Sequence, residues 1–291
     1  MEAQKDQLYI TTSWDDGHPL DLRVAELLDK YGLPATFYLP LVSKNPLLAH
    51  SEIREIRKKY EIGAHTITHC DLSRVDDRVA RKEIAGCKEQ LEQIIGAPCT
   101  AFCFPYGHFR RKHIKYVLEA GYQTARTTEL MSTEVPRVRD GVAILATTAQ
   151  AVPSTFGVYE RNALKRLRLA NLLRCLRYGT SDWVKITEAL LTHMLKKGGV
   201  FHLWGHSWEV NERAQWANVE RAFALLAQFK QSAVFLPNGD FASLASFAEL
   251  SPVTVPLPKS YDLEEGIAAK KIAVKPNFLY EDSGFEARSG G

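Results

Sequence analysis

Short apolar runs alternate with longer segments of helical spacing along most of the chain. Apolar runs bounded by turn-forming residues predict β-strands at 8–13, 35–39, 62–66, 100–104, 122–127, 142–147, 200–203 and 233–236. Segments in which apolar residues recur at every third or fourth position predict α-helices at 20–31, 51–59, 75–95, 110–120, 159–178, 183–197, 211–230 and 241–249. Strand followed by helix, repeated in this way, is typical of an α/β protein with a parallel sheet.

The number of strand–helix units decides how many domains to expect. At about 150 residues per domain, a chain of 291 residues would form two, but α/β barrels reach roughly 250 residues as one domain. About seven or eight units precede residue 250, which favours one closed or nearly closed barrel. After Ser251 the pattern stops and prolines recur. We therefore expect a barrel over residues 1–250 and an irregular tail over residues 251–291.

Composition and charge exclude several classes of function. With 45% hydrophobic and 24% charged residues the chain is close to globular averages, so wholesale disorder is excluded. A net charge of +3 is too small to indicate nucleic acid or an anionic membrane as a partner. The helix expected at 159–178 is locally basic, and we expect its cations on a solvated outer face, or alternatively against an anionic group of a substrate.

The N-terminus and the cysteines bear on location. Residues 1–6 are polar and lack the apolar core of a secretory signal peptide. No stretch reaches the roughly 18 uninterrupted apolar residues of a transmembrane helix. The five cysteines include no CxxC pair, so neither a disulfide framework nor a cysteine zinc site is indicated. We expect a cytoplasmic protein without a membrane span.

Two adjacent carboxylates, Asp15 and Asp16, end the first strand candidate. Parallel α/β proteins build their active sites at the carboxyl ends of the strands, where this pair lies. The Asp-Gly sequence that follows is also typical of a turn, and an Asp can cap the next helix. A functional interpretation gives the carboxylates separate tasks, one as a metal ligand and the other as a nearby base.

Two histidines four residues apart, His65 and His69, follow the third strand candidate. This spacing brings both imidazoles to one face of a helix, or to one side of a strand that runs into a loop. A chance pair of surface histidines would show the same spacing. Together with an oxygen ligand such as Asp16, they would make a three-ligand site with open positions, as catalytic zinc requires.

The fourth strand candidate ends in Phe104-Pro105-Tyr106-Gly107. A turn of this kind can direct a backbone N–H group into a pocket, where it would stabilise the oxyanion formed when water attacks a carbonyl. A plain strand-ending turn explains the same residues. The segment is therefore informative only in combination with the first two.

In this order and rough spacing, the three segments resemble motifs of the polysaccharide deacetylase family, the NodB-homology domain of carbohydrate esterase family 4. Residues 13–17 are similar to its Thr-Phe-Asp-Asp-Gly motif, 65–69 to its His-Ser/Thr-x-x-His motif, and 104–107 to the end of its Arg-x-Pro-Tyr-Gly-like motif. The similarity extends over roughly residues 8–250. It implies a distorted (β/α)7 barrel of the NodB type and a hydrolase that removes N-acetyl groups from an N-acetylated sugar or glycan.

The resemblance also implies roles for individual residues. Asp15 would be the general base that deprotonates a metal-bound water. Asp16, His65 and His69 would hold a divalent metal, usually zinc in this family. The backbone N–H of Tyr106 would complete the oxyanion hole.

In this family the general acid is a His at the end of a late barrel strand. Here His202 and His206 share parity along the strand candidate at 200–203, so both could face the barrel interior. We expect His206 to be the acid because it lies past the apolar run, toward the catalytic mouth, and His202 is the second choice. Trp204, Trp208 and Glu209 would line a sugar site, although a core or rim role fits each Trp equally.

Two positions depart from the family's pattern. Where the third motif usually has an Arg that orients the base, this chain has Cys103. Arg126, near the end of the fifth strand candidate, could replace that cation or bind the substrate. The fourth motif, an Asp-Trp pair, would match Asp182-Trp183, which a helix N-cap explains as well.

The leading hypothesis is thus a metal-dependent carbohydrate de-N-acetylase. One alternative is a hydrolase of the same fold that cleaves another non-peptide C–N bond, in a formamide or a cyclic ureide, since some relatives do so without metal. The other is a non-catalytic carbohydrate-binding barrel. The intact set of carboxylates and histidines argues against that last alternative, and only the Cys103 departure favours it.

Overall fold

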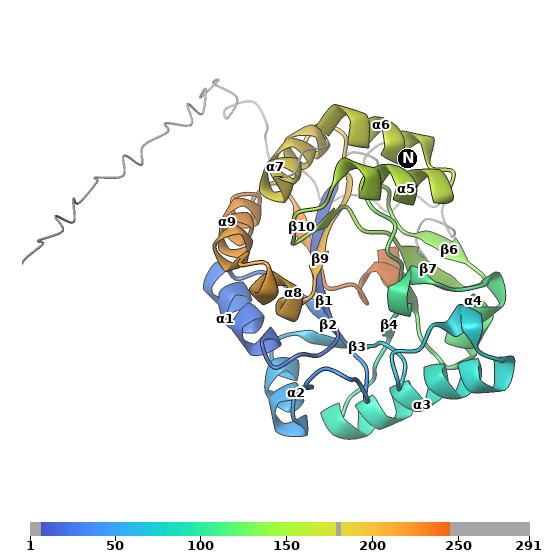
Figure 1. Cartoon of the computed structure of the whole chain (residues 1–291). Helices are drawn as coiled ribbons and strands as arrows, with labels where there is room; N and C mark the ends of the chain where they lie inside the picture. The colour runs from blue at the N-terminus through green and yellow to red at the C-terminus, as the bar shows by residue number, and fades with distance from the viewer. Residues whose placement is uncertain (1–6, 179–181, 245–291) are drawn as a thin grey trace, which may run out of the picture. The chain divides into compact units, whose positions relative to one another are not determined.

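A parallel barrel with seven strand positions forms the centre of the computed structural model, which describes residues 7–178 and 182–244. Its wall consists of β1 (Leu8–Asp15), β2 (Thr36–Leu39), β3 (Glu61–Ala64), β4 (Ala101–Cys103), β5 (Thr124–Arg126), β7 (Val142–Leu145), β8 (Ala149–Gln150) and β9 (Gly199–Gly205). Figure 1 shows helices around this wall: α1 (Asp21–Tyr31), α2 (His50–Arg57), α3 (Asp77–Ile95), α4 (Arg111–Glu119), α5 (Phe156–Lys165), α6 (Leu169–Tyr178), α7 (Trp183–Met194), α8 (Ser207–Glu212) and α9 (Trp216–Ala227).

An interrupted strand closes the ring. Hydrogen bonds connect the strands in the order β6-β7-β5-β4-β3-β2-β1-β9-β8, where β6 (Arg137–Arg139) is antiparallel to β7. The strands β7 and β8 are consecutive in the chain, and β7 pairs with β5 while β8 pairs with β9. Together they fill one position, with residues 146–148 as the break. The expected distorted (β/α)7 barrel is therefore confirmed.

Several elements differ from the sequence-based expectation, among them β6, β8 and α8, which were not predicted. The strand expected at 233–236 is only the two-residue β10 (Val234–Phe235), which pairs with the start of β1. The single basic helix expected at 159–178 is two helices, α5 and α6, separated by Leu167 in the left-handed conformation (φ 53°). The tail expected at 251–291 lies outside the described residues, so that domain boundary stays a prediction.

The alternation of β1 determines what faces the barrel interior. Trp14 packs edge-on against Phe223 of α9, with ring centroids 6.0 Å apart, so even-numbered residues at this end of β1 face the helices. Ser13 and Asp15 therefore face inward. All three residues are buried, because a barrel strand is covered by helices outside and by side chains inside.

Successive layers along β1 become more polar toward its carboxyl end. At the bottom Tyr9 packs against Phe241, and above it the Thr11 hydroxyl donates to Asn238 Oδ1 at 2.8 Å. The next layer pairs Ser13 with His202, whose Nε2 lies 2.8 Å from the Ser13 hydroxyl oxygen. The alternation thus delivers Asp15 to the open mouth of the barrel. None of the helices in the described part of the chain is both long and apolar enough to cross a membrane.

Candidate active site

Two consecutive left-handed residues end β1 and separate its two carboxylates. Asp16 has φ 77° and Gly17 has φ 62°, a conformation that costs a non-glycine residue energy and marks functional sites. A β-carbon on Gly17 would also lie only 3.0 Å from the Leu39 side chain. Asp15 stays inside the barrel as the last residue of β1, while Asp16 lies on the turn at the mouth.

The loop after β3 brings its two histidines to Asp16. His65 Nε2 lies 3.8 Å and His69 Nε2 lies 3.3 Å from Asp16 Oδ1. The loop adopts left-handed conformations at Thr66 and His69, so the histidines are on neither a helix nor a continuing strand. Glu83 of α3 fixes the loop, since its carboxylate accepts hydrogen bonds from the backbone N–H and the hydroxyl of Thr68, both at 2.9 Å.

Hydrogen bonds at the far ring nitrogens orient both imidazoles. His65 Nδ1 lies 2.9 Å from the backbone oxygen of Cys103, which can only accept, so Nδ1 carries the proton and Nε2 presents a lone pair. Burial and the neighbouring His69 hold the pKa of His65 well below its ordinary value, so the ring is neutral. His69 Nδ1 lies 3.1 Å from the Tyr106 hydroxyl, which holds the second ring by its far nitrogen.

These residues fit a divalent cation. Asp16 Oδ2 accepts a hydrogen bond from the Trp208 indole N–H at 2.9 Å, whereas the buried Oδ1 has no hydrogen-bond partner among residues 7–178 and 182–244. In a tetrahedral zinc site with bonds of about 2.0–2.2 Å, ligand atoms lie roughly 3.3–3.6 Å apart. The separations around Asp16 Oδ1 are close to that range, and one oxygen with two imidazole nitrogens is a donor set that zinc accepts.

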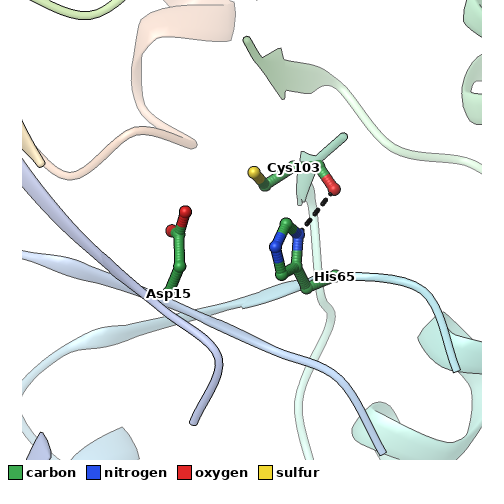
Figure 2. A group of neighbouring side chains, drawn as sticks. All are labelled: Asp15, His65 and Cys103. Atoms are coloured by element: carbon green, nitrogen blue, oxygen red, sulfur yellow. Dashed lines mark hydrogen bonds between the residues drawn. The ribbon is translucent and has the colours of Figure 1, made fainter. Parts of the chain in front are cut away.

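A second grouping of ionisable side chains, Asp15, His65 and Cys103, fits a cation poorly. Figure 2 shows Asp15 and the Cys103 side chain beside the His65 ring, with the bond from His65 Nδ1 to the Cys103 oxygen. Burial raises the pKa of the Cys103 thiol well above its ordinary value, which keeps it protonated and a weak ligand. Arg126 also contacts both the Asp15 carboxylate and the Cys103 sulfur, so a cation there would face a guanidinium.

Arg126 of β5 is fully buried and forms an ion pair with Asp15 Oδ2. Burial alone would lower the pKa of Arg126, but the Asp15 carboxylate and the Cys103 and Tyr38 side chains outweigh it and raise that pKa above its ordinary value. Because Arg126 has no exposed surface, the substrate-binding role expected from the sequence does not fit it. The alternative, a cation beside the base where the family's motif has Arg, agrees with this contact.

The two histidines of the β9 segment have different surroundings. His202 is fully buried, with Nδ1 2.9 Å from the Ala146 oxygen, and burial with the nearby Arg126 lowers its pKa to about 3. His206 follows β9 at the mouth, with Nε2 4.0 Å from Asp15 Oδ2 and Nδ1 3.3 Å from Glu209 Oε2. His202, the second choice for the general acid, is therefore a neutral interior residue away from the cavity.

The pKa of His206 reflects two opposing influences. Burial lowers it, but the hydrogen bond to Glu209 and the charges of Asp15 and Asp16 outweigh burial and raise it above its ordinary value. At neutral pH this favours an imidazolium at the mouth of the barrel.

A cavity of about 660 Å³ opens over these groups, within the size range of small-molecule sites. The predicted site residues that line it are Asp15, Asp16, His65, His69, Tyr106, Trp204, His206 and Trp208. Tyr106 is the most exposed of these aromatic rings, at 57%, and its backbone is left-handed (φ 57°) between two buried residues. Trp204 is almost covered and its ring lies 4.9 Å from the Arg126 guanidinium carbon, so only part of it can meet a ligand.

Some residues of the site have roles that were not predicted from the sequence. Glu209, expected at a sugar site, holds His206 from the first turn of α8, and the only signal for this contact is its three-residue spacing in a helix. Glu83 gives no signal, because it contacts the histidine loop from another helix. Asp21 is fully buried near the two carboxylates, and burial raises its pKa well above the ordinary value, which keeps it uncharged. Asp182 caps α7 by accepting from the Val184 N–H, as its helix-cap interpretation predicts.

Comparison with known proteins supports the resemblance. The sequence model of the family described as polysaccharide deacetylase matches residues 2–125, a range that contains the carboxylate pair, both histidines of the loop after β3 and the Pro-Tyr-Gly turn. No curated protein matches the sequence. The resemblance stated from the motifs is thereby confirmed over the first part of the chain.

Solved structures extend the likeness to most of the barrel. A Mycobacterium smegmatis protein described as a polysaccharide deacetylase has TM-score 0.63 and 17% identity, over 89% of this chain and 97% of that one. The chitin deacetylase of the fungal pathogen Colletotrichum lindemuthianum has TM-score 0.53 and 14% identity, over 82% and 89%. A peptidoglycan N-acetylglucosamine deacetylase has TM-score 0.52 and 15% identity, over 81% and 89%. At these identities the likeness shows a shared fold.

Proposed function

We propose that the chain, whose residues 2–125 match the sequence model of the polysaccharide deacetylase family, is a metal-dependent hydrolase that removes an N-acetyl group from an N-acetylated sugar or glycan. The observation that carries the proposal is the position of the Asp16, His65 and His69 ligand atoms, which all lie within 4.8 Å of one another beside Asp15 and His206. Zinc is the cation proposed, held by these three side chains. When bound, it would supply a Lewis acid that polarises water and the amide carbonyl.

Asp15 is proposed as the general base. Arg126 occupies its Oδ2, while Oδ1 is buried and meets no hydrogen-bonding group of the described chain. One oxygen is therefore fixed and the other is free to take a proton from an attacking water. The carboxylate faces the cavity where an amide carbonyl would lie, so the proton moves from water to Oδ1 as the new C–O bond forms.

His206 is proposed as the general acid that protonates the leaving amine. Glu209 fixes its Nδ1 side, which leaves Nε2 directed toward the carboxylates and the cavity. An amine is a poor leaving group unless it is protonated, so an acid within reach of the scissile nitrogen is required. The Tyr106 backbone N–H is the proposed donor to the oxyanion, on a left-handed turn that lines the same cavity.

Aromatic side chains around the cavity support a sugar as substrate. The exposed ring of Tyr106 and the half-buried Trp208 offer apolar faces of the kind on which a pyranose ring packs. Because the Trp208 N–H already bonds Asp16, its proposed contact with sugar uses the ring face. Gln150 and Asn45 add neutral hydrogen-bonding groups suited to hydroxyls.

The test is acetate release from N-acetylhexosamine oligosaccharides by the purified protein, supplied with zinc or stripped by a chelator. We expect release that needs zinc and falls on the order of a thousandfold or more in Asp15→Asn, which keeps the shape of the base but not its charge. Unaltered release by the stripped protein, or by Asp15→Asn, contradicts the proposal. Formate release from an N-formylated sugar, with no acetate release, would instead support the formamide alternative.

A further inference from the structure

The helices α5 and α6, which pack side by side (Figure 1), carry a concentrated exposed apolar surface. Seven of the thirteen large apolar side chains exposed among residues 7–178 and 182–244 fall between Phe156 and Leu176. Five of them are leucines, at positions 164, 167, 169, 173 and 176. Single exposed leucines need no explanation, but a cluster of this kind marks an interaction surface.

The spacing of these leucines makes the solvent side of α6 apolar. Leu169, Leu173 and Leu176 follow one another at intervals of four and three residues, which places them on one helix face. The buried residues of α6, Asn171 and Cys175, lie on the opposite face. The usual arrangement of a surface helix, with apolar residues inward and polar residues outward, is thus reversed on α6.

Leu167 projects from the turn between the two helices. It is 92% exposed and its backbone is left-handed (φ 53°), a strained conformation for a leucine. A large apolar side chain exposed at the tip of a turn buries little surface and so contributes little to the stability of the fold. We therefore count it with the apolar surface of α5 and α6.

The same segment carries a concentrated positive charge. Residues 156–178 contain six Lys and Arg against one acidic residue, Glu160, a net charge of +5 where the whole chain has only +3. Arg161, Lys165 and Arg177 are exposed. The remaining three cations are half-buried and contact the barrel, as Arg168 does through Glu129 at 2.9 Å.

We propose that the outer surface of α5 and α6, made of the five leucines together with Arg161, Lys165 and Arg177, docks on an anionic lipid membrane surface. Leucines enter the boundary between headgroups and acyl chains, while lysines and arginines beside them attract anionic headgroups. A second copy of the chain is a poorer partner. Two-fold symmetry would press Arg161, Lys165 and Arg177 of one copy toward the same cations of the other.

The docking surface adjoins the catalytic cavity. Val158 and Asn162 of α5 line that cavity, and Asn162 is fastened to the loop after β5, accepting from the Leu130 N–H at 3.0 Å and donating to the Thr128 oxygen at 2.8 Å. Docking would therefore hold the rim of the cavity at the lipid headgroups. Docking itself does not depend on the proposed function. The further inference that the reacting sugar is carried at the membrane does rest on the proposed function.

The test is co-sedimentation of the full chain with vesicles of phosphatidylcholine that contain an increasing fraction of phosphatidylglycerol. We expect binding that rises with the anionic fraction and weakens with salt. Two variants, Leu167→Glu with Leu173→Glu and Arg161→Glu with Lys165→Glu, should each lower the partition constant at least about tenfold.

A matched control substitutes exposed leucines elsewhere. Leu118 and Leu195 are each 44% exposed, and Leu118→Glu with Leu195→Glu adds the same charge away from α5 and α6. The control should bind as the wild type does. No sedimentation at low salt, equal loss in the control, or equal binding to neutral vesicles would overturn the proposal. The proposal would also be overturned if the protein self-associates and the leucine variant abolishes this self-association, because the surface would then bind a second copy.

Circular dichroism checks that each variant is folded. Because sedimentation does not depend on acetate release, the proposed function can fail independently.

Discussion

The mouth of the barrel and the layer below it are built from the same two strands, β1 and β9, but their polar groups differ in one respect. In the lower layer His202 uses both ring nitrogens, one with Ser13 and one with the Ala146 oxygen. At the mouth Asp15 and Asp16 each have one oxygen held by a neighbour and one buried oxygen that no group of the described chain satisfies. An unsatisfied buried acceptor costs free energy, so its presence indicates a site kept ready for a ligand.

We propose that this difference separates residues that serve the fold from residues that serve the reaction. Substitutions in the lower layer should change stability and leave chemistry alone. Substitutions at the mouth should change activity and leave stability alone. Substitution of Arg126, which lies between the two layers, should change both stability and activity.

The largest effect is expected from Arg126→Met. Removing the guanidinium leaves Asp15 as an uncompensated buried charge, which should lower the free energy of unfolding by about 3–5 kcal/mol and abolish most activity. Chemical denaturation measures the change. The double variant Arg126→Met with Asp15→Asn should recover much of the lost stability. If the losses of unfolding free energy in the two single variants simply add in the double variant, the ion pair does not stabilise the fold.

The next effect concerns Trp208, which the sequence assigned to the sugar. Trp208→Phe keeps an aromatic ring but removes the N–H that holds Asp16 Oδ2, so zinc affinity should fall about 10- to 100-fold. Competition with a chromogenic chelator measures it. Trp204→Phe is the matched control, because the Trp204 indole nitrogen has no hydrogen-bond partner in the described part of the chain. Equal affinities in the two variants would show that Trp208 does not position the ligand.

A smaller effect is expected in the lower layer from Ser13→Ala. The substitution leaves His202 Nε2 buried without its partner, which should cost about 1–3 kcal/mol of stability. Acetate release at saturating zinc should stay within about twofold of the wild type, since Ser13 does not line the cavity. A large fall in activity without a loss of stability would place this layer in the chemistry.

The smallest effect is a dependence of stability on pH. The pKa of His202 is about 3 in the folded chain, far below 6.5, so below pH 6.5 the unfolded chain binds a proton that the folded chain does not. His202 therefore destabilises the fold as the pH falls from 6.5 toward 3. Between pH 7 and pH 5 its contribution should be about 2 kcal/mol. Denaturant titrations of His202→Gln should show a correspondingly weaker loss, and an unchanged pH profile would contradict a neutral buried ring.

The sequence predicted those parts of the site that are local in the chain. Asp15 and Asp16 are adjacent, and His65 and His69 lie within one loop, so motif spacing was sufficient. The contact of Trp208 with Asp16 spans 192 positions and depends on the closure of the barrel, which no local pattern encodes. Arg126 was found only as a candidate because the motif Arg was missing, and its burial ruled out the contact with substrate.

Two structural features were hidden for similar reasons. The interruption between β7 and β8 was not predicted, because the apolar run at 142–147 covers β7 and part of the break but ends before β8, which pairs with β9 and not with β5. The whole-chain charge of +3 concealed the cations of residues 156–178, since the rest of the chain offsets them. A total charge averages over surfaces, whereas a partner meets only one of them.

The most direct test of the account is to locate zinc in crystals of the loaded protein by anomalous scattering. We predict one ion within about 2.0–2.2 Å of Asp16 Oδ1, His65 Nε2 and His69 Nε2, with Asp15 outside that distance and still paired with Arg126. An ion held by Asp15, His65 and Cys103, or no ion in the barrel mouth at saturating zinc, would contradict the central claim.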